Sequence, residues 1–171
     1  MGGCGNPRGA ACARTSHRPT WSERPEHTLG AARHDVPASV AAMAITRFDP
    51  PASATERETL EAFLDYHRAT LSLKCDGLSD EQLRERAVAP STLSLLGLVR
   101  HMADVERSWF RRVMDGQDAP PLYYSDSDPD GDFDNTADDT AASALAAWAR
   151  EIAASREVVA GIDVLDTMST V

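Results

Sequence analysis

The hydrophobic and polar positions of this 171-residue chain divide it into two parts that meet near residue 43. Residues 1–42 show neither the 3.6-residue period of a helix nor the two-residue period of a strand, and Gly, Pro, Arg and His interrupt them repeatedly. Because so few large apolar side chains cannot offset the entropy lost on ordering, we interpret residues 1–42 as an N-terminal extension that is disordered, or that precedes the true start at Met43. Residues 43–171 are predicted to form one domain.

A helical pattern begins at Thr55, where a threonine followed three residues later by a glutamate forms a capping box. This helix is predicted to end at Gly77. A second capping box at Ser79 predicts a short helix that ends near Arg86. The first helix carries an apolar stripe at helical spacing: Leu60, Phe63, Leu64, His67, Leu71 and Leu78.

Two further long helices are predicted, from Thr92 or Ser94 to about Asp115 and from about Asp139 to Ala160. The acidic segment 115–138 between them is long for a loop, and such loops are usually functional or disordered. The stripe of the earlier helix comprises Leu95, Leu98, Met102, Val105, Trp109 and Val113, with Trp109 expected in the core. The later stripe comprises Ala141, Leu145, Trp148, Ile152, Ser155 and Val159, with Arg150, Glu151, Arg156 and Glu157 turned to water.

These elements, with no strand pattern, predict an all-α fold, an antiparallel up-down helical bundle. Residues 162–171 look like a loop rather than a fourth helix, so the bundle is expected to be incomplete at its C-terminus. One apolar face would then lack a partner and favour a possible homodimer.

Charge and composition narrow the function. The formal net charge of −10 disfavours binding to nucleic acid or to an anionic membrane surface. No apolar run is long enough to span a bilayer, and no signal peptide is evident. Three cysteines are too few for a disulfide scaffold, so we expect a cytoplasmic protein.

His101 is the best candidate for chemistry, because it borders the apolar stripe of its helix. His67 lies on the stripe of the first helix, and an antiparallel pairing of the two helices would put both imidazoles at a similar depth. Two such nitrogens suit Zn²⁺, Ni²⁺ or Fe²⁺ inside a bundle, with Asp104 and Glu106 as carboxylates that could orient the rings. Two histidines alone are too few for tight binding, and a hydrogen-bonded histidine at the edge of the core is the structural alternative.

The run 90–107, together with 64–68 and 128–133, resembles the DinB-like superfamily, and more narrowly its actinobacterial, mini-circle-protein-like branch. The resemblance implies a four-helix bundle in which three histidines bind a divalent metal, one matching His101 and two from a later His-x-x-x-His pair. It further implies a metal-dependent transferase or hydrolase that uses a low-molecular-weight thiol such as mycothiol and a small-molecule electrophile. A metal lowers the pKa of a bound thiol, which supplies the reactive thiolate.

This chain departs from that pattern, because no histidine follows His101. We therefore expect a copy truncated before the distal pair, with weak metal binding and negligible turnover. The alternative is a non-catalytic helical interaction module that self-associates. A third option is a calcium-responsive loop at 126–132, whose alternating aspartates match only the first half of a calcium-binding loop.

Overall fold

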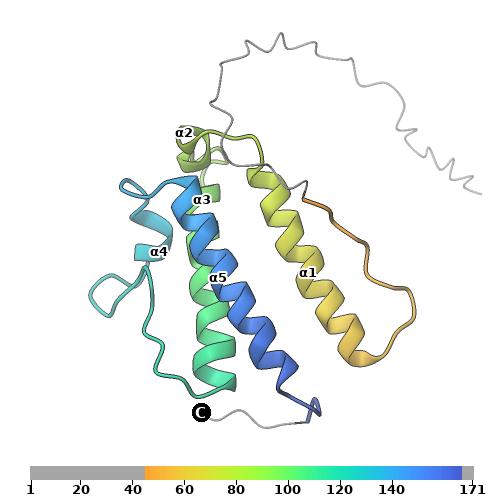
Figure 1. Ribbon diagram of the computed structural model, residues 1–171. Coiled ribbons are helices and arrows are strands. Elements are labelled where there is room, and N and C mark those ends of the chain that lie inside the picture. The colour runs from red at the N-terminus through yellow and green to blue at the C-terminus, as the bar shows by residue number, and fades with distance from the viewer. Residues whose placement is uncertain (1–44, 167–171) are drawn as a thin grey trace, which may run out of the picture. The chain divides into compact units, whose positions relative to one another are not determined.

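The computed structural model describes residues 45–166, and within them the fold is all-α, as predicted (Figure 1). The long helices are α1 (Glu56–Cys75), α3 (Leu95–Glu106) and α5 (Ala141–Ala160). The segment η1 (Arg107–Met114) continues α3 as a π-helix, and α2 (Asp80–Arg84) and α4 (Gly131–Asp134) are short. The described residues contain one isolated β-bridge, between Ser125 and Asp128, and no named strand.

The helices begin where their capping residues place them. The side chains of Thr55, Ser79 and Thr140 each accept a hydrogen bond from the backbone N–H three residues on, and each capping box is reciprocal. Ser94 caps α3 through the N–H of Gly97. Each cap pairs a backbone donor that the first helical turn would otherwise leave unsatisfied. The predicted starts at Thr55, Ser79 and Ser94 are confirmed.

The long helices do not all alternate in direction. α1 is antiparallel to α5, since Arg57 near the start of α1 donates to the carbonyls of Val159 and Ile162 at the end of α5. By contrast, α3 and α5 run the same way: Arg100 pairs with Asp139 just before α5, and Arg107 pairs farther along with Glu151 (Figure 1). The long segment 115–138 is therefore a crossover that returns the chain along the bundle, as in helical folds with one long connection.

The core lies where α3 packs against α5, and its fully buried members include Leu96, Val99, Ala103 and Trp148. The prediction for Trp148 is confirmed, but Trp109 is 60% exposed, so its predicted place in the core is wrong. The buried face of α3 includes Leu96, Val99 and Ala103, whereas the predicted stripe that ends at Trp109 lies along the half-buried edge of that face.

Glu151 was expected in water and is instead 6% exposed. Its carboxylate accepts hydrogen bonds from the guanidinium groups of Arg107 and Arg111. Since both arginines lie on η1, this cluster joins η1 to α5. Pairing with two guanidinium groups is what allows the carboxylate to be buried.

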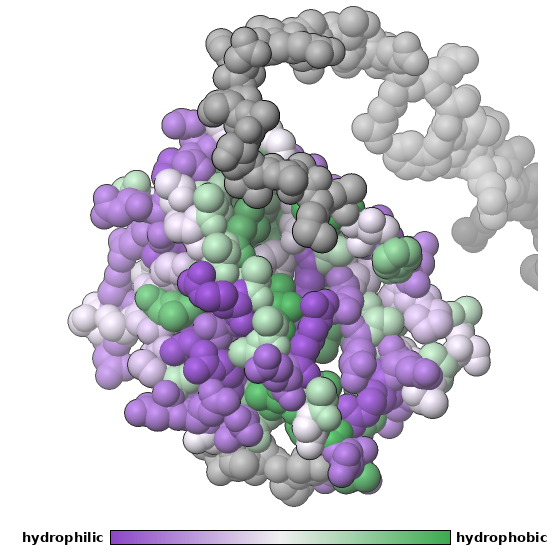
Figure 2. Space-filling model, viewed as in Figure 1, coloured by the Kyte–Doolittle hydropathy of each residue, from purple (hydrophilic) through white to green (hydrophobic). Residues whose placement is uncertain are grey.

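α1 buries less apolar surface than its sequence pattern predicts. Its buried residues are Arg68 and Cys75, whereas Leu60, Phe63 and Leu64 of the predicted stripe are 51%, 49% and 38% exposed. On the face shown in Figure 2 hydrophilic residues predominate, and the hydrophobic groups form separate small patches. Among the described residues no helix is long and apolar enough to cross a membrane.

Candidate functional site

His101 lies on α3, one helical turn after Gly97, and faces the short helix α4. Its Nδ1 lies 2.6 Å from Oδ2 of Asp132, and its ring stacks on Phe133 with 4.2 Å between the ring centroids. A carboxylate accepts hydrogen bonds, so Nδ1 can donate to Oδ2 of Asp132 when it carries a proton. Asp132 is buried and the His101 side chain is 34% exposed, so one edge of the ring is held inside the protein while the rest reaches the surface.

Helices α3 and α4 meet at a glycine and a buried arginine, both of which lie on α3. A Cβ atom added to Gly97 would lie 2.5 Å from the carbonyl oxygen of Phe133, so only glycine permits this approach of α4 to α3. Arg100 donates from Nη1 to the carbonyl of Asp132 at 3.0 Å, and its guanidinium lies over the ring of Tyr123. The backbone of α4 is thus fixed against α3 next to His101.

A pocket of about 350 Å³ opens beside this pair. Its wall contains aromatic and acidic side chains and, apart from His101, no basic residue; the lining residues are His101, Asp104, Val105, Ser108, Trp109, Tyr124, Pro129, Asp130, Asp132 and Phe133. The exposure of Trp109, unexpected for a core residue, is explained by its place on this wall. The arrangement suits a small ligand that meets a single imidazole between aromatic side chains.

Asp104 and Glu106, predicted to orient the histidines, are buried but have other partners. Both carboxylate oxygens of Asp104 accept backbone N–H groups, from Leu122 at 2.7 Å and from Tyr123 at 3.0 Å. Burial raises the pKa of Asp104, and these two hydrogen bonds oppose the rise without cancelling it. Asp104 therefore anchors the crossover segment to α3, and Asp132 is the carboxylate that contacts His101.

Glu106 instead binds Arg68 on α1 through two hydrogen bonds, of 2.8 Å and 2.7 Å. Burial alone would lower the pKa of Arg68, but the bonds and charge of Glu106 reverse this and raise it. The pair links α1 to α3 and makes no contact with either histidine among the interactions of the described residues.

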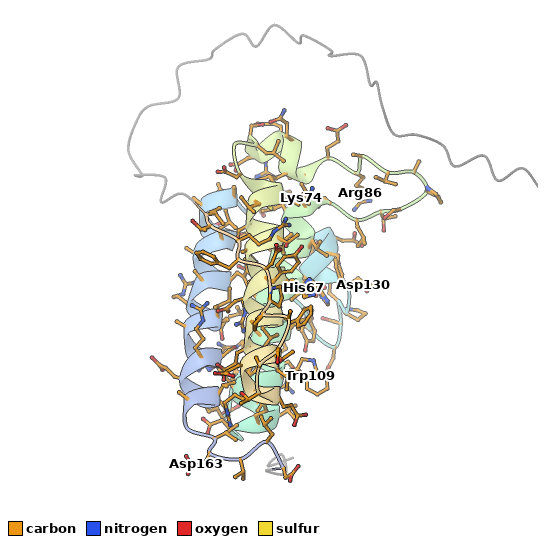
Figure 3. The ribbon with its side chains drawn as sticks, turned by 90° about the vertical axis from the view of Figure 1, so that its right-hand side faces the viewer. His67, Lys74, Arg86, Trp109, Asp130 and Asp163 are labelled. Carbon is orange, nitrogen blue, oxygen red and sulfur yellow. The ribbon has the colours of Figure 1, made fainter. Side chains whose placement is uncertain are left out.

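The structure does not bring His67 into the pocket at His101. His67 is exposed on α1, where its ring packs against Phe63 and Tyr66 (Figure 3). Its neighbour Arg68 takes the position that faces α3. The helical stripe could not reveal this, because an arginine with a buried partner looks like a surface residue in sequence.

A divalent metal of the kind the superfamily resemblance implies needs at least three protein donors. His101 would offer Nε2, and Asp132 behind Nδ1 is the partner that ligating histidines commonly have. Yet within residues 45–166 no group of three His, Cys, Asp or Glu side chains could hold a metal ion. The described residues therefore do not fit a complete metal centre, and this holds for the aspartates of the 126–132 loop as well.

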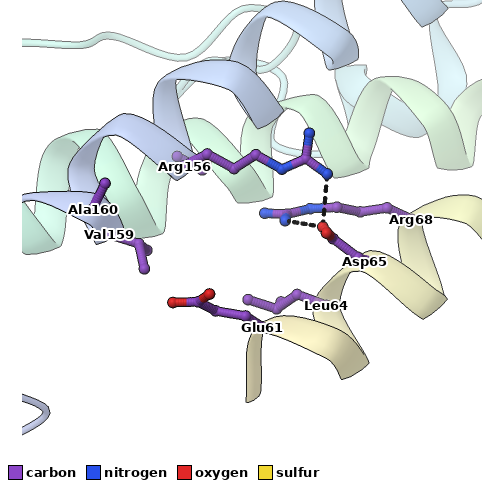
Figure 4. A pocket seen from close by; sticks show the side chains of 8 residues that line it. Glu61, Leu64, Asp65, Arg68, Arg156, Val159 and Ala160 are labelled. Carbon is purple, nitrogen blue, oxygen red and sulfur yellow. Dashed lines mark hydrogen bonds and ion pairs between the residues drawn. The ribbon is translucent and has the colours of Figure 1, made fainter. Parts of the chain in front are cut away.

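A separate pocket of about 260 Å³ lies between α1 and α5 (Figure 4). Its floor is an ion cluster in which Oδ1 of Asp65 accepts from Arg68 at 3.0 Å and from Arg156 at 2.8 Å. The rest of the lining consists of Glu61, Leu64, Ser155, Val159 and Ala160. Because its charged groups are already paired with one another, the cluster serves to hold α1 to α5.

The contact between His101 and Asp132 joins residues 31 positions apart, and the sequence offered Asp132 as part of the incomplete calcium motif and of the run 128–133, without a role beside His101. Comparison with known proteins gives a match to the family described as Mycothiol-S-transferase over residues 59–171, a family within the DinB-like superfamily. Searches of curated proteins and of solved structures give no match. The matched region includes all of α2, α3, α4 and α5, with the pocket at His101, and the chain belongs to the mycothiol S-transferase family.

Proposed function

We propose that the pocket at His101 is the thiol site of this protein, and that it receives mycothiol or a similar low-molecular-weight thiol together with a small electrophile. The observation that carries this proposal is the His101 imidazole, which lines the pocket and is held at Nδ1 by buried Asp132. The other ring nitrogen can then accept a hydrogen bond from the S–H group of a thiol. The family match is consistent with this chemistry.

The acidic wall of the pocket affects which charge the electrophile can carry. Asp130 and Asp132 place carboxylates at the pocket without a neighbouring arginine or lysine on the wall. We expect neutral or cationic electrophiles to enter more readily than anionic ones, because an anion would meet like charge at short range.

We further propose that a divalent metal can bind this protein, with His101 as its one histidine donor. We expect Zn²⁺, Ni²⁺ or Fe²⁺ to bind weakly at Nε2 of His101, since the described residues supply no set of three donors. We also expect the protein to turn over a small electrophile at a negligible rate. Titration calorimetry with Zn²⁺ should give a weak affinity that His101→Ala abolishes and His67→Ala preserves.

Thiol binding can be tested without turnover by following the indole N–H resonances in the nuclear magnetic resonance spectrum. Mycothiol should shift the signal of Trp109, which lines the pocket, and leave that of buried Trp148 unchanged. His101→Ala should weaken the binding at least several-fold. The proposal fails if mycothiol leaves Trp109 unaffected, or if His101→Ala binds it as well as the wild type does.

A second candidate is a helical module that pairs with a copy of itself. The observation that favours it is the exposed apolar stripe of α1, in which Phe63 and Leu64 lie about one turn after Leu60. Sedimentation velocity should then show a dimer that Phe63→Glu dissociates, whereas a monomer at high protein concentration would exclude this function. Leu73→Glu, which replaces an exposed leucine of the same helix outside the stripe, is the matched control.

A further inference from the structure

The peptide that carries Asp132 is fixed on several sides. Gly97 lets the backbone of Phe133 approach α3, and a Cβ atom on Gly131 would lie 2.7 Å from the carbonyl oxygen of Tyr123. Arg100, itself 3% exposed and paired with Asp139 at 2.8 Å, donates to the carbonyl of Asp132. α4 therefore has little freedom to slide along α3.

The carboxylate of Asp132 is equally restricted. Its Oδ1 accepts the backbone N–H of Phe133 at 3.0 Å, which leaves Oδ2 directed at Nδ1 of His101. The side chain is 5% exposed, so water competes little for either oxygen. On the other side, stacking on Phe133 sets the plane of the imidazole ring.

We propose that Asp132 is a positioning residue that fixes neutral His101 as the Nδ1–H tautomer, so that the lone pair of Nε2 faces the pocket. In an unconstrained histidine side chain the Nε2–H tautomer is the more populated one. A carboxylate at Nδ1 reverses that preference, because it can only accept a hydrogen bond. Among residues 45–166 Nε2 makes no hydrogen bond, so it is the nitrogen left for a ligand.

The tautomer decides which ligands the pocket accepts. With the lone pair on Nε2 the pocket presents an acceptor, which suits a donor such as a thiol S–H or a hydroxyl group. With the proton on Nε2 it would present a donor and disfavour those same groups. This inference rests on the proposed function only for the identity of the ligand, since the tautomer is a property of the free protein.

The test is the ring ¹⁵N spectrum of protein labelled at histidine, recorded where the ring is neutral, with His101→Gln used to assign the signals. In the wild type His101 should show the pattern of a protonated Nδ1, while exposed His67 serves as an internal reference. In Asp132→Ala and Asp132→Asn the proton should move to Nε2, so the ¹⁵N chemical shifts of the two His101 ring nitrogens should exchange. Asp130→Asn removes a carboxylate from the same pocket and should leave them in place.

The wild-type spectrum alone can overturn the proposal, whatever the stability of the variants: a protonated Nε2 in neutral His101 would do so. An unchanged pattern in Asp132→Ala would also overturn the proposal. The same exchange in Asp130→Asn would overturn it as well, because it would show a general effect of charge. Because no thiol or electrophile is present, the ring spectrum tests the tautomer alone. A protonated Nε2 would remove the acceptor that the thiol proposal assigns to His101, whereas thiol binding itself is measured separately through the Trp109 signal. A failure to bind mycothiol leaves the tautomer result standing.

Discussion

The pair of Arg68 and Glu106 is the link between α1 and α3 whose energy can be worked out from the structure. The guanidinium binds the carboxylate through Nε and Nη2, and the two side chains are only 10% and 4% exposed. Removing one partner of such a buried pair leaves the other charge without compensation, which typically costs about 3–5 kcal/mol. That is a large fraction of the roughly 5–15 kcal/mol that stabilises an ordinary domain.

Glu106→Gln preserves the shape of the side chain but replaces one acceptor oxygen by an amide donor that faces Nη2 of Arg68. We expect it to lower the free energy of unfolding by about 3 kcal/mol or more, and Arg68→Met to do the same. The double variant Arg68→Met with Glu106→Leu should recover most of this loss, because packed apolar side chains avoid the cost of burying charge.

The measurement is urea unfolding at 25 °C for the wild type, both single variants and the double variant. The control is Glu61→Gln, which removes an exposed i,i+4 partner of Arg57 at 3.5 Å and should cost only about 0.3–0.5 kcal/mol. The reasoning would be refuted if Glu106→Gln cost no more than Glu61→Gln, or if the double variant lost the sum of the two single losses.

Other positions give independent predictions. Gly97→Ala should lower the free energy of unfolding by about 1–3 kcal/mol, because its Cβ would strike the backbone of Phe133, whereas Gly161→Ala, with 3.4 Å to the nearest atom, should be nearly neutral in the same urea titration. Burial raises the pKa of the Cys75 thiol above its ordinary value of 9.0, so with the other two cysteines replaced by serine a thiol reagent should modify native protein far more slowly than unfolded protein. Because the pKa of Cys75 is higher in the folded protein, the contribution of its thiol to stability is fully present below about pH 9 and is lost as the pH rises through the folded pKa. Thermal melts recorded across that range should show this loss in the wild type and not in Cys75→Ala. Thr140→Ala should cost about 1 kcal/mol in thermal unfolding through the lost cap of α5, and an unchanged midpoint would contradict the capping assignment.

The candidate site was only partly readable from the sequence. His101 was identified because it borders an apolar stripe, a property of one helix. Its partner Asp132 could not be identified, because the contact depends on how α4 docks on α3 at Gly97. The same limit explains why Asp104 and Glu106 were assigned to His101: they are near it in sequence, but their side chains leave α3 in other directions.

The sequence by itself determined the local structure of the described region. Capping at Thr55, Ser79 and Ser94, and the glycines at 77 and 116 that adopt positive φ, are decided within a few residues, so the helix boundaries could be read directly. Only the tertiary structure decided that α3 and α5 run in the same direction, that Trp109 lies outside the buried face of its helix and that Arg68 rather than His67 faces α3. Each of these depends on pairings between distant residues, whose energies a local pattern of hydrophobic and polar positions does not contain.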